Sequence, residues 1–166
     1  VLSAFWLWRV NPAIFAARRR AGAGTKAWDY AIVGAVVVGF TAVLWIASTA
    51  KDTDFTAAIS DVQPDGTARA LTDGIIRARY RRSKTTPELL VPGTRYEVRI
   101  DVGATGNVFL PGHRIRVEVT SSNFPKFVRN LNTGGKNEFE KDGVIATNQV
   151  KHTASQPSYI VLPVIK

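Results

Sequence analysis

The sequence predicts an all-β fold, built as an antiparallel sandwich or barrel. From Phe55 onward, apolar and polar residues alternate with a period of two, which is typical of strands that are buried on one face. Proline and glycine turn sequences separate the alternating runs, and no stretch after Asp54 has a convincing helical period. We therefore expect short strands joined by tight turns, without βαβ units.

The composition is that of one domain without a metal or disulfide framework. The chain has 166 residues, no cysteine, and two histidines, His113 and His152, that lie far apart. A cysteine nucleophile is therefore excluded, and a helical zinc motif has no support. Residues 1–30 hold five basic residues and one acid, so they carry +4 of the net charge of +9. The remaining +5 is typical of a solvated surface and argues against nucleic-acid binding.

The first fifty residues differ from the rest. Residues 1–30 are an atypical basic and apolar leader, which could be a short amphipathic helix or an irregular segment. Residues 31–40 are an uncertain apolar segment. Residues 31–50 carry no charge, so they could cross a membrane as one helix or form part of a signal peptide. Their content of Val, Ile and Thr fits two buried strands equally well.

Two later runs show the strand pattern most clearly. In residues 95–102, RYEVRIDV, the apolar side chains fall on one face and the charged ones on the other. Residues 114–120, RIRVEVT, repeat this pattern, with Ile115, Val117 and Val119 opposite charged neighbours. Because strand side chains alternate between the two faces, both apolar sets are expected to point into the core.

The segments between the runs carry turn chemistry. Four of them combine proline, aspartate or glycine in the order that a reversal requires: residues 63–67, 72–74, 91–94 and 110–113. The run IIRARYRR, residues 75–82, is predicted to be a strand with Arg77, Arg79 and Arg81 on one face. A basic stripe could hold phosphates, but a solvated strand face that pairs with carboxylates is the favoured interpretation.

No catalytic constellation is evident. A G-x-S-x-G elbow is absent, and Ser121 and Ser122 end a strand instead. His113 follows Pro111 and Gly112 in a turn, without the sequence context of a triad. Asp52 and Asp54 supply too few oxygens for calcium, so hydrogen bonding at a turn or strand edge is their expected role. No catalytic, cofactor-binding or metal residue is predicted.

From about Thr41 to Ile165 the chain resembles the C-terminal domain of the Xaa-Pro dipeptidyl-peptidase, cocaine esterase and α-amino-acid ester hydrolase family of serine hydrolases. Its segments LWIASTAKDTDFTAAISDVQPDG, LTDGIIRARYR, PGTRYEVRIDV, TGNVFLPGHRIRVEVTSSNFPKFVRNLNTGG and HTASQPSYIVLPVI stand in the family's order. The resemblance implies a jelly-roll, galactose-binding-like β-sandwich over residues 41–166. It also implies an α/β-hydrolase catalytic domain as partner, normally in the same chain. Early strands of the sandwich are expected to be missing, as in a gene fragment or truncated product.

The loop SSNFPKFVRNLNTGG, residues 121–135, is the candidate contact with that partner. Its asparagines can bond their own backbone, and its phenylalanines offer apolar anchors beside basic residues. A self-packed surface loop is the alternative. The candidate interface residues are Phe109, His113, Asn123, Phe124, Phe127, Arg129 and Asn130.

The functional prediction is a non-catalytic sandwich module of a serine hydrolase that helps to shape the substrate pocket. Two alternatives stay open, namely a module that binds carbohydrates or surfaces and a domain anchored in a membrane through residues 31–50. The predicted location is cytoplasmic, with membrane anchoring or export as the alternatives.

Overall fold

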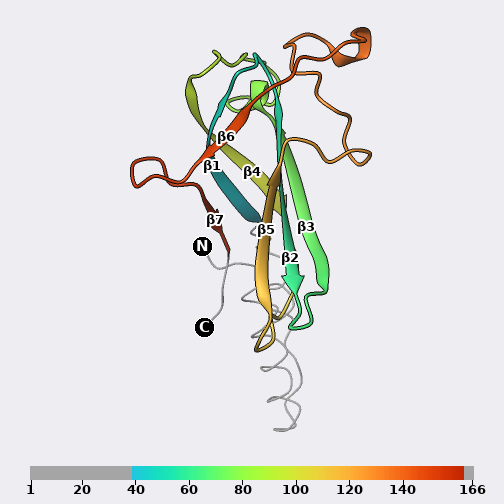
Figure 1. Cartoon of the computed structure of the whole chain (residues 1–166), viewed down its shortest axis with the longest axis vertical. Coiled ribbons are helices and arrows are strands. Elements are labelled where there is room, and N and C mark those ends of the chain that lie inside the picture. Colours follow the sequence, from blue (N-terminus) through green and yellow to red (C-terminus); the bar gives the residue numbers. More distant parts are fainter. Residues whose placement is uncertain (1–38, 163–166) are drawn as a thin grey trace, which may run out of the picture.

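The structure, a computed structural model, describes residues 39–162 (Figure 1). These residues form two antiparallel sheets, and their helical content is limited to two single 3-10 turns. The strands are β1 (Phe40–Ser48), β2 (Asp54–Val62), β3 (Ala68–Arg77), β4 (Arg95–Gly103), β5 (Arg114–Thr120), β6 (Asn148–Lys151) and β7 (Tyr159–Val161). The predicted all-β, sandwich-like fold is confirmed at this level.

Each sheet is centred on one long, buried strand. In the first sheet, β1 pairs with β4 on one side, and β6 and β7 share its other side. In the second sheet, β2 lies between β3 and β5. β1 and β2 are the central strands of these sheets, and nearly all of their residues are buried.

The second half of the uncharged run lies in β1. Residues 40–48 form a strand, so residues 31–50 do not make one continuous membrane helix. Within residues 39–162, no helix is both long and apolar enough to cross a membrane. The predictions for residues 1–30 and 31–38 lie outside the described residues.

The core lies between the two sheets. Its largest fully buried side chains include Ile46 of β1, Phe55 and Ile59 of β2, and Ile100 of β4. At about 25 cal/mol per Å² of apolar surface, each such side chain stabilises the fold by roughly 2–3 kcal/mol. The alternating apolar residues of β4 therefore point inward, as the sequence predicts.

One side of the sandwich is closed by contact between β3 and β4. The hydroxyl of Thr72 donates a hydrogen bond to the carbonyl oxygen of Val102 at 2.5 Å. A Cβ atom at Gly74 would lie 1.9 Å from the carbonyl oxygen of Asp101, so only glycine fits there. The turn predicted over residues 72–74 is wrong, because this glycine permits close packing of two sheets rather than a reversal.

Three of the four predicted turns are confirmed. Residues 63–67, 91–94 and 110–113 reverse the chain, with Gly66, Gly93 and Gly112 at φ of 91°, 78° and 84°. The predicted strand over residues 75–82 is only partly correct. It ends at Arg77 and a 3-10 turn, Ala78–Tyr80, follows.

The opposite side of the sandwich is open. Ile115, Val117 and Val119 of β5 are 45%, 39% and 36% exposed, although the sequence predicts that they point into the core. Two of these side chains, Val117 and Val119, line a groove, so the inner face of β5 has little packed over it within the described residues. The inward direction of these side chains is correct, and their predicted burial is wrong.

Candidate functional site

Two buried carboxylates lie where the chain enters β2. Asp52 and Asp54 are 0% and 3% exposed. Asp52 accepts hydrogen bonds from Nε and the backbone N of Arg79 at 2.6 and 2.9 Å. Asp54 accepts a hydrogen bond from Nε of Arg77 at 3.1 Å. The hydrogen-bonding role predicted for the two aspartates is confirmed, and the arginines of the basic run are their partners.

Charge pairing compensates for the burial of these groups. Burial by itself would lower the pKa of the Arg77 guanidinium, but its hydrogen bond to Asp54 and the charges of Asp54 and Asp52 raise that pKa above its usual value. Arg79 is only 11% exposed, and Arg81 only 2%. The prediction of a solvated arginine face is therefore wrong for these two residues, while the predicted pairing with carboxylates is correct.

Asn130 joins the long loop to this network. Its Nδ2 atom lies 2.9 Å from Oδ2 of Asp52 and 2.7 Å from Oδ1 of Asp54, so one amide bridges both carboxylates. Arg79 also donates to the carbonyl oxygen of Gly135 at 2.9 Å. We refer to residues 121–147 as the connecting loop. Its middle is fixed to the sandwich by hydrogen bonds in which one partner is a charged side chain, and such bonds are stronger than those between neutral groups.

The start of the connecting loop is tied to β3. Asn123 donates from Nδ2 to Oδ2 of Asp73 at 2.8 Å, and Lys126 forms an ion pair with the same carboxylate. The predicted bonds of asparagines to the loop's own backbone are present: the N–H of Asn132 donates to Oδ1 of Asn130 at 2.9 Å, and Nδ2 of Asn132 donates to the carbonyl oxygen of Val144 at 2.9 Å. The loop is therefore an ordered structure rather than a loose connection.

The connecting loop displays apolar side chains to solvent. Among the predicted interface residues, Phe124 is 68% exposed, Arg129 is exposed and Phe127 is half-buried. Sequence reasoning missed several further exposed apolar residues of the loop: Val128 at 73%, Phe139 at 83%, Val144 at 53% and Ile145 at 96%. The available signal was an apolar group in a polar stretch without a strand or helix period, which a search for alternation passes over.

Phe109 and His113 lie elsewhere. Both belong to the connection between β4 and β5, at the other end of β2 from the carboxylates (Figure 1). Nδ1 of His113 lies 2.9 Å from Oδ1 of Asp61, which is 7% exposed, and this pair fixes the turn before β5. The structure therefore brings five of the seven predicted interface residues together and separates these two.

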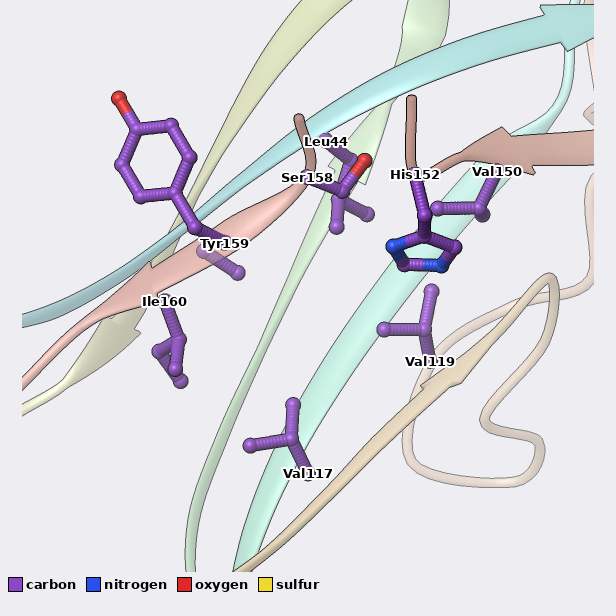
Figure 2. A pocket seen from close by; sticks show the side chains of 9 residues that line it. Leu44, Val117, Val119, Val150, His152, Ser158, Tyr159 and Ile160 are labelled. Carbon is purple, nitrogen blue, oxygen red and sulfur yellow. The ribbon is translucent and has the colours of Figure 1, made fainter. Parts of the chain in front are cut away.

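The open side of the sandwich forms a groove with a volume of about 500 Å³. Figure 2 shows β5 on one wall and the β6 and β7 region on the other. It is lined by Ala42, Leu44, Val117, Val119, Val150, His152, Ser158, Tyr159 and Ile160. The Ser158 hydroxyl donates to the carbonyl oxygen of Lys151 at 2.7 Å and accepts from the N–H of Trp45 at 2.9 Å. Ser158 thus joins β7 to β1, which is a structural role.

Metal ligands do not gather in the described part of the chain. Between residues 39 and 162 there is no group of three or more histidine, aspartate or glutamate side chains that could hold an ion. The carboxylates of Asp52 and Asp54 are instead bonded to arginine and asparagine donors. These bonds hold the connecting loop, with its exposed apolar side chains, in a fixed position on the sandwich.

Comparison with known proteins points to the same kind of domain. Residues 29–161 match the family of the X-Pro dipeptidyl-peptidase C-terminal non-catalytic domain. This match begins upstream of residue 41, where the predicted resemblance starts. The chain is 54% identical over 125 residues to cocaine esterase of Rhodococcus sp. (strain MB1 Bresler), covering 74% of this chain and 22% of the esterase. A putative serine esterase of Mycobacterium bovis is 31% identical over 113 residues, which are 58% of this chain and 17% of that protein.

Solved structures agree with this result. An α-amino acid ester hydrolase is 31% identical with a TM-score of 0.73, over 78% of this chain and 23% of the hydrolase. An aminopeptidase from a marine sediment archaeon is 35% identical with a TM-score of 0.69, over 73% of this chain and 22% of the enzyme. The chain spans about a fifth of the length of the curated relatives. It belongs to the X-Pro dipeptidyl-peptidase C-terminal non-catalytic domain family.

Proposed function

We propose that this domain packs against the α/β-hydrolase catalytic domain of a serine ester hydrolase and helps to wall its substrate pocket. Esters are the favoured substrate class, because two of the similar proteins are named as a cocaine esterase and an α-amino acid ester hydrolase. Amide bonds after proline are the alternative. The activated serine and its acyl-enzyme chemistry belong to the catalytic domain.

One observation carries this proposal: the connecting loop is rigidly held, and yet it exposes large apolar side chains. Phe139 and Ile145 are 83% and 96% exposed, while Asn130 in the same loop bonds two buried carboxylates. An apolar group that is exposed on an ordered loop is typical of an interaction surface. Because the loop is already ordered, packing against a partner costs little conformational entropy.

We also propose that the complete sandwich has jelly-roll, galactose-binding-like topology. The link between β4 and β5 crosses from one sheet to the other, and so does the link between β5 and β6. Such crossings are expected when strands alternate between the two sheets of a jelly roll. Further strands from the polypeptide that precedes β1 would complete the open side.

A chimaera with the similar cocaine esterase tests the interface. Residues 39–162 of this chain would replace the matching region of the Rhodococcus enzyme, and ester hydrolysis and Tm would be measured. Phe139→Ser should lower both values, because it removes an apolar contact between the domains. Leu110→Ser is the matched control, since Leu110 is 57% exposed but lies in the turn before β5.

The proposal requires a difference between these two variants. Equal activity and Tm of the Phe139→Ser and Leu110→Ser chimaeras would reject the loop as the contact surface. The chain alone should hydrolyse no chromogenic ester. Saturable hydrolysis by the purified chain that a serine-directed inhibitor abolishes would contradict the non-catalytic role.

A further inference from the structure

The middle of the connecting loop is a compact unit that its own hydrogen bonds close. We refer to residues 129–144 as the lobe. Nδ2 of Asn137 donates to the carbonyl oxygen of Arg129 at 2.6 Å, and the N–H of Val144 donates to the carbonyl oxygen of Leu131 at 2.8 Å. The 3-10 turn Asn137–Phe139, in orange in Figure 1, lies away from both sheets. The position of Phe139 therefore depends on how the lobe is attached to the sandwich.

The lobe is attached to the sandwich at one point. Within residues 39–162, the hydrogen bonds that join it to the rest of the chain come from Asn130 and Arg79. Asn130 donates to Asp52 and Asp54, and Arg79 donates to the carbonyl oxygen of Gly135. These bonds converge on Asp52, whose Oδ2 atom accepts from Nδ2 of Asn130 at 2.9 Å and from Nε of Arg79 at 2.6 Å. Because Asp52 is buried, water competes little for them.

The attachment point requires an asparagine. Its amide nitrogen carries two hydrogens, one for each carboxylate, and its amide oxygen accepts from the N–H of Asn132 at 2.9 Å. Both polar groups of the Asn130 side chain therefore have partners. Alanine would offer no donor. Aspartate has nearly the same shape, but it would place a third carboxylate against two buried ones. Replacement by aspartate thus removes the donors without leaving a cavity.

We propose that Asn130 is the positioning residue of the hydrolase interface. It fixes the lobe on Asp52 and Asp54, so that Phe139 meets the catalytic domain in a single arrangement. This inference rests on the proposed function, in which the connecting loop packs against that domain. Asn130 acts on the reaction only through the place that it gives to Phe139. Because a misplacement of about 1 Å can slow an enzymatic reaction by about a hundredfold, loss of the amide should impair ester hydrolysis although the catalytic residues are intact.

Kinetics of the chimaera with cocaine esterase test this role. Asn130→Ala should lower kcat/KM for a chromogenic ester by at least about tenfold. Asn130→Asp should lower it further, because it adds a negative charge beside two others. Active sites are titrated with a serine-directed inhibitor, so that a loss of folded enzyme does not enter kcat/KM. Gln63→Ala is the matched control and should keep the parental value, since it removes an amide in the turn at the other end of β2.

A double variant shows whether Asn130 acts through Phe139. If it does, Asn130→Ala lowers kcat/KM little further once Phe139→Ser has removed the contact. The double variant Asn130→Ala/Phe139→Ser should therefore lie within about twofold of Phe139→Ser alone. A merely structural role of Asn130 would give additive losses instead, because a weakened fold and a lost contact are independent effects.

Hydrogen exchange of the 166-residue chain measures the attachment of the lobe without the hydrolase. In Asn130→Ala, residues 129–144 should exchange faster than in the parental chain, and residues 95–103 should be unchanged. Unchanged exchange in the lobe, parental kcat/KM in the chimaera, or additive losses in the double variant would each overturn the proposal. Failure of the proposed function gives a different result: Phe139→Ser then equals Leu110→Ser in the chimaera, while the lobe of Asn130→Ala still exchanges faster.

Discussion

Strands β4 and β5 have nearly the same sequence pattern and opposite environments. Both alternate apolar with charged residues, as RYEVRIDVG and RIRVEVT, and both are edge strands of their sheets. In β4, Val98, Ile100 and Val102 are at most 1% exposed. The equivalent side chains of β5 are 36% to 45% exposed.

The difference lies in what covers each strand. β4 packs against β3, where Gly74 and Thr72 approach its backbone closely. The inner face of β5 borders the groove instead. Alternation therefore predicts the two faces of a strand, whereas burial depends on a neighbouring element that the strand's own sequence does not specify.

On the side where β3 packs against β4, loss of a buried carboxylate near the end of β3 should lower the free energy of unfolding the most. Asp52→Ala leaves the Arg79 guanidinium buried without its carboxylate, and loss of one partner of a buried pair costs about 3–5 kcal/mol. Chemical denaturation would measure the free energy of unfolding. Asp142→Ala is the control, because Asp142 is exposed and should change stability by less than about 0.5 kcal/mol. Equal effects of the two changes would refute the network.

A matched pair of isoleucines compares the two strands directly. Ile100→Ala in β4 removes a fully buried side chain and should cost about 2–5 kcal/mol. Ile115→Ala in β5 removes one that is 45% exposed, so its cost should stay below about 1 kcal/mol. The free energy of unfolding of both variants is measured by chemical denaturation. A similar loss for both would show that β5 is covered.

Gly74→Ala tests whether β3 and β4 pack as closely as the structure shows. The added methyl group would meet the carbonyl oxygen of Asp101, so the two sheets must separate, at a cost of about 1–3 kcal/mol. Thermal unfolding of Gly74→Ala beside the parental chain measures the change in Tm. An unchanged Tm would mean that β3 and β4 are not in close contact.

Much of the fold could be predicted from sequence, because local patterns determine it. The strands over residues 95–102 and 114–120, and the turns at residues 63–67, 91–94 and 110–113, follow from alternation and glycine chemistry. The errors have non-local causes. The sequence predicts a turn at Gly74, because the close contact between the sheets that requires this glycine is visible only in three dimensions. The basic run ends its strand at Arg77, where its arginines bond the buried aspartates.

The candidate site was predictable in its location but not in its contacts. The sequence indicates the loop around Asn123, Phe124 and Asn130, and the family resemblance explains why a partner is expected. That Asn130 bridges Asp52 and Asp54, across more than seventy residues of chain, could not be inferred from spacing. Phe139 and Ile145 were missed because an exposed apolar residue leaves no periodic signal.

Hydrogen exchange of the backbone amides of the two edge strands tests the central contrast most directly. Residues 114–120 should exchange faster than residues 95–103, because the inner face of β5 borders the groove whereas β4 packs against β3. Equally slow exchange of both strands would contradict the account, since it would mean that β5 is as well covered as β4.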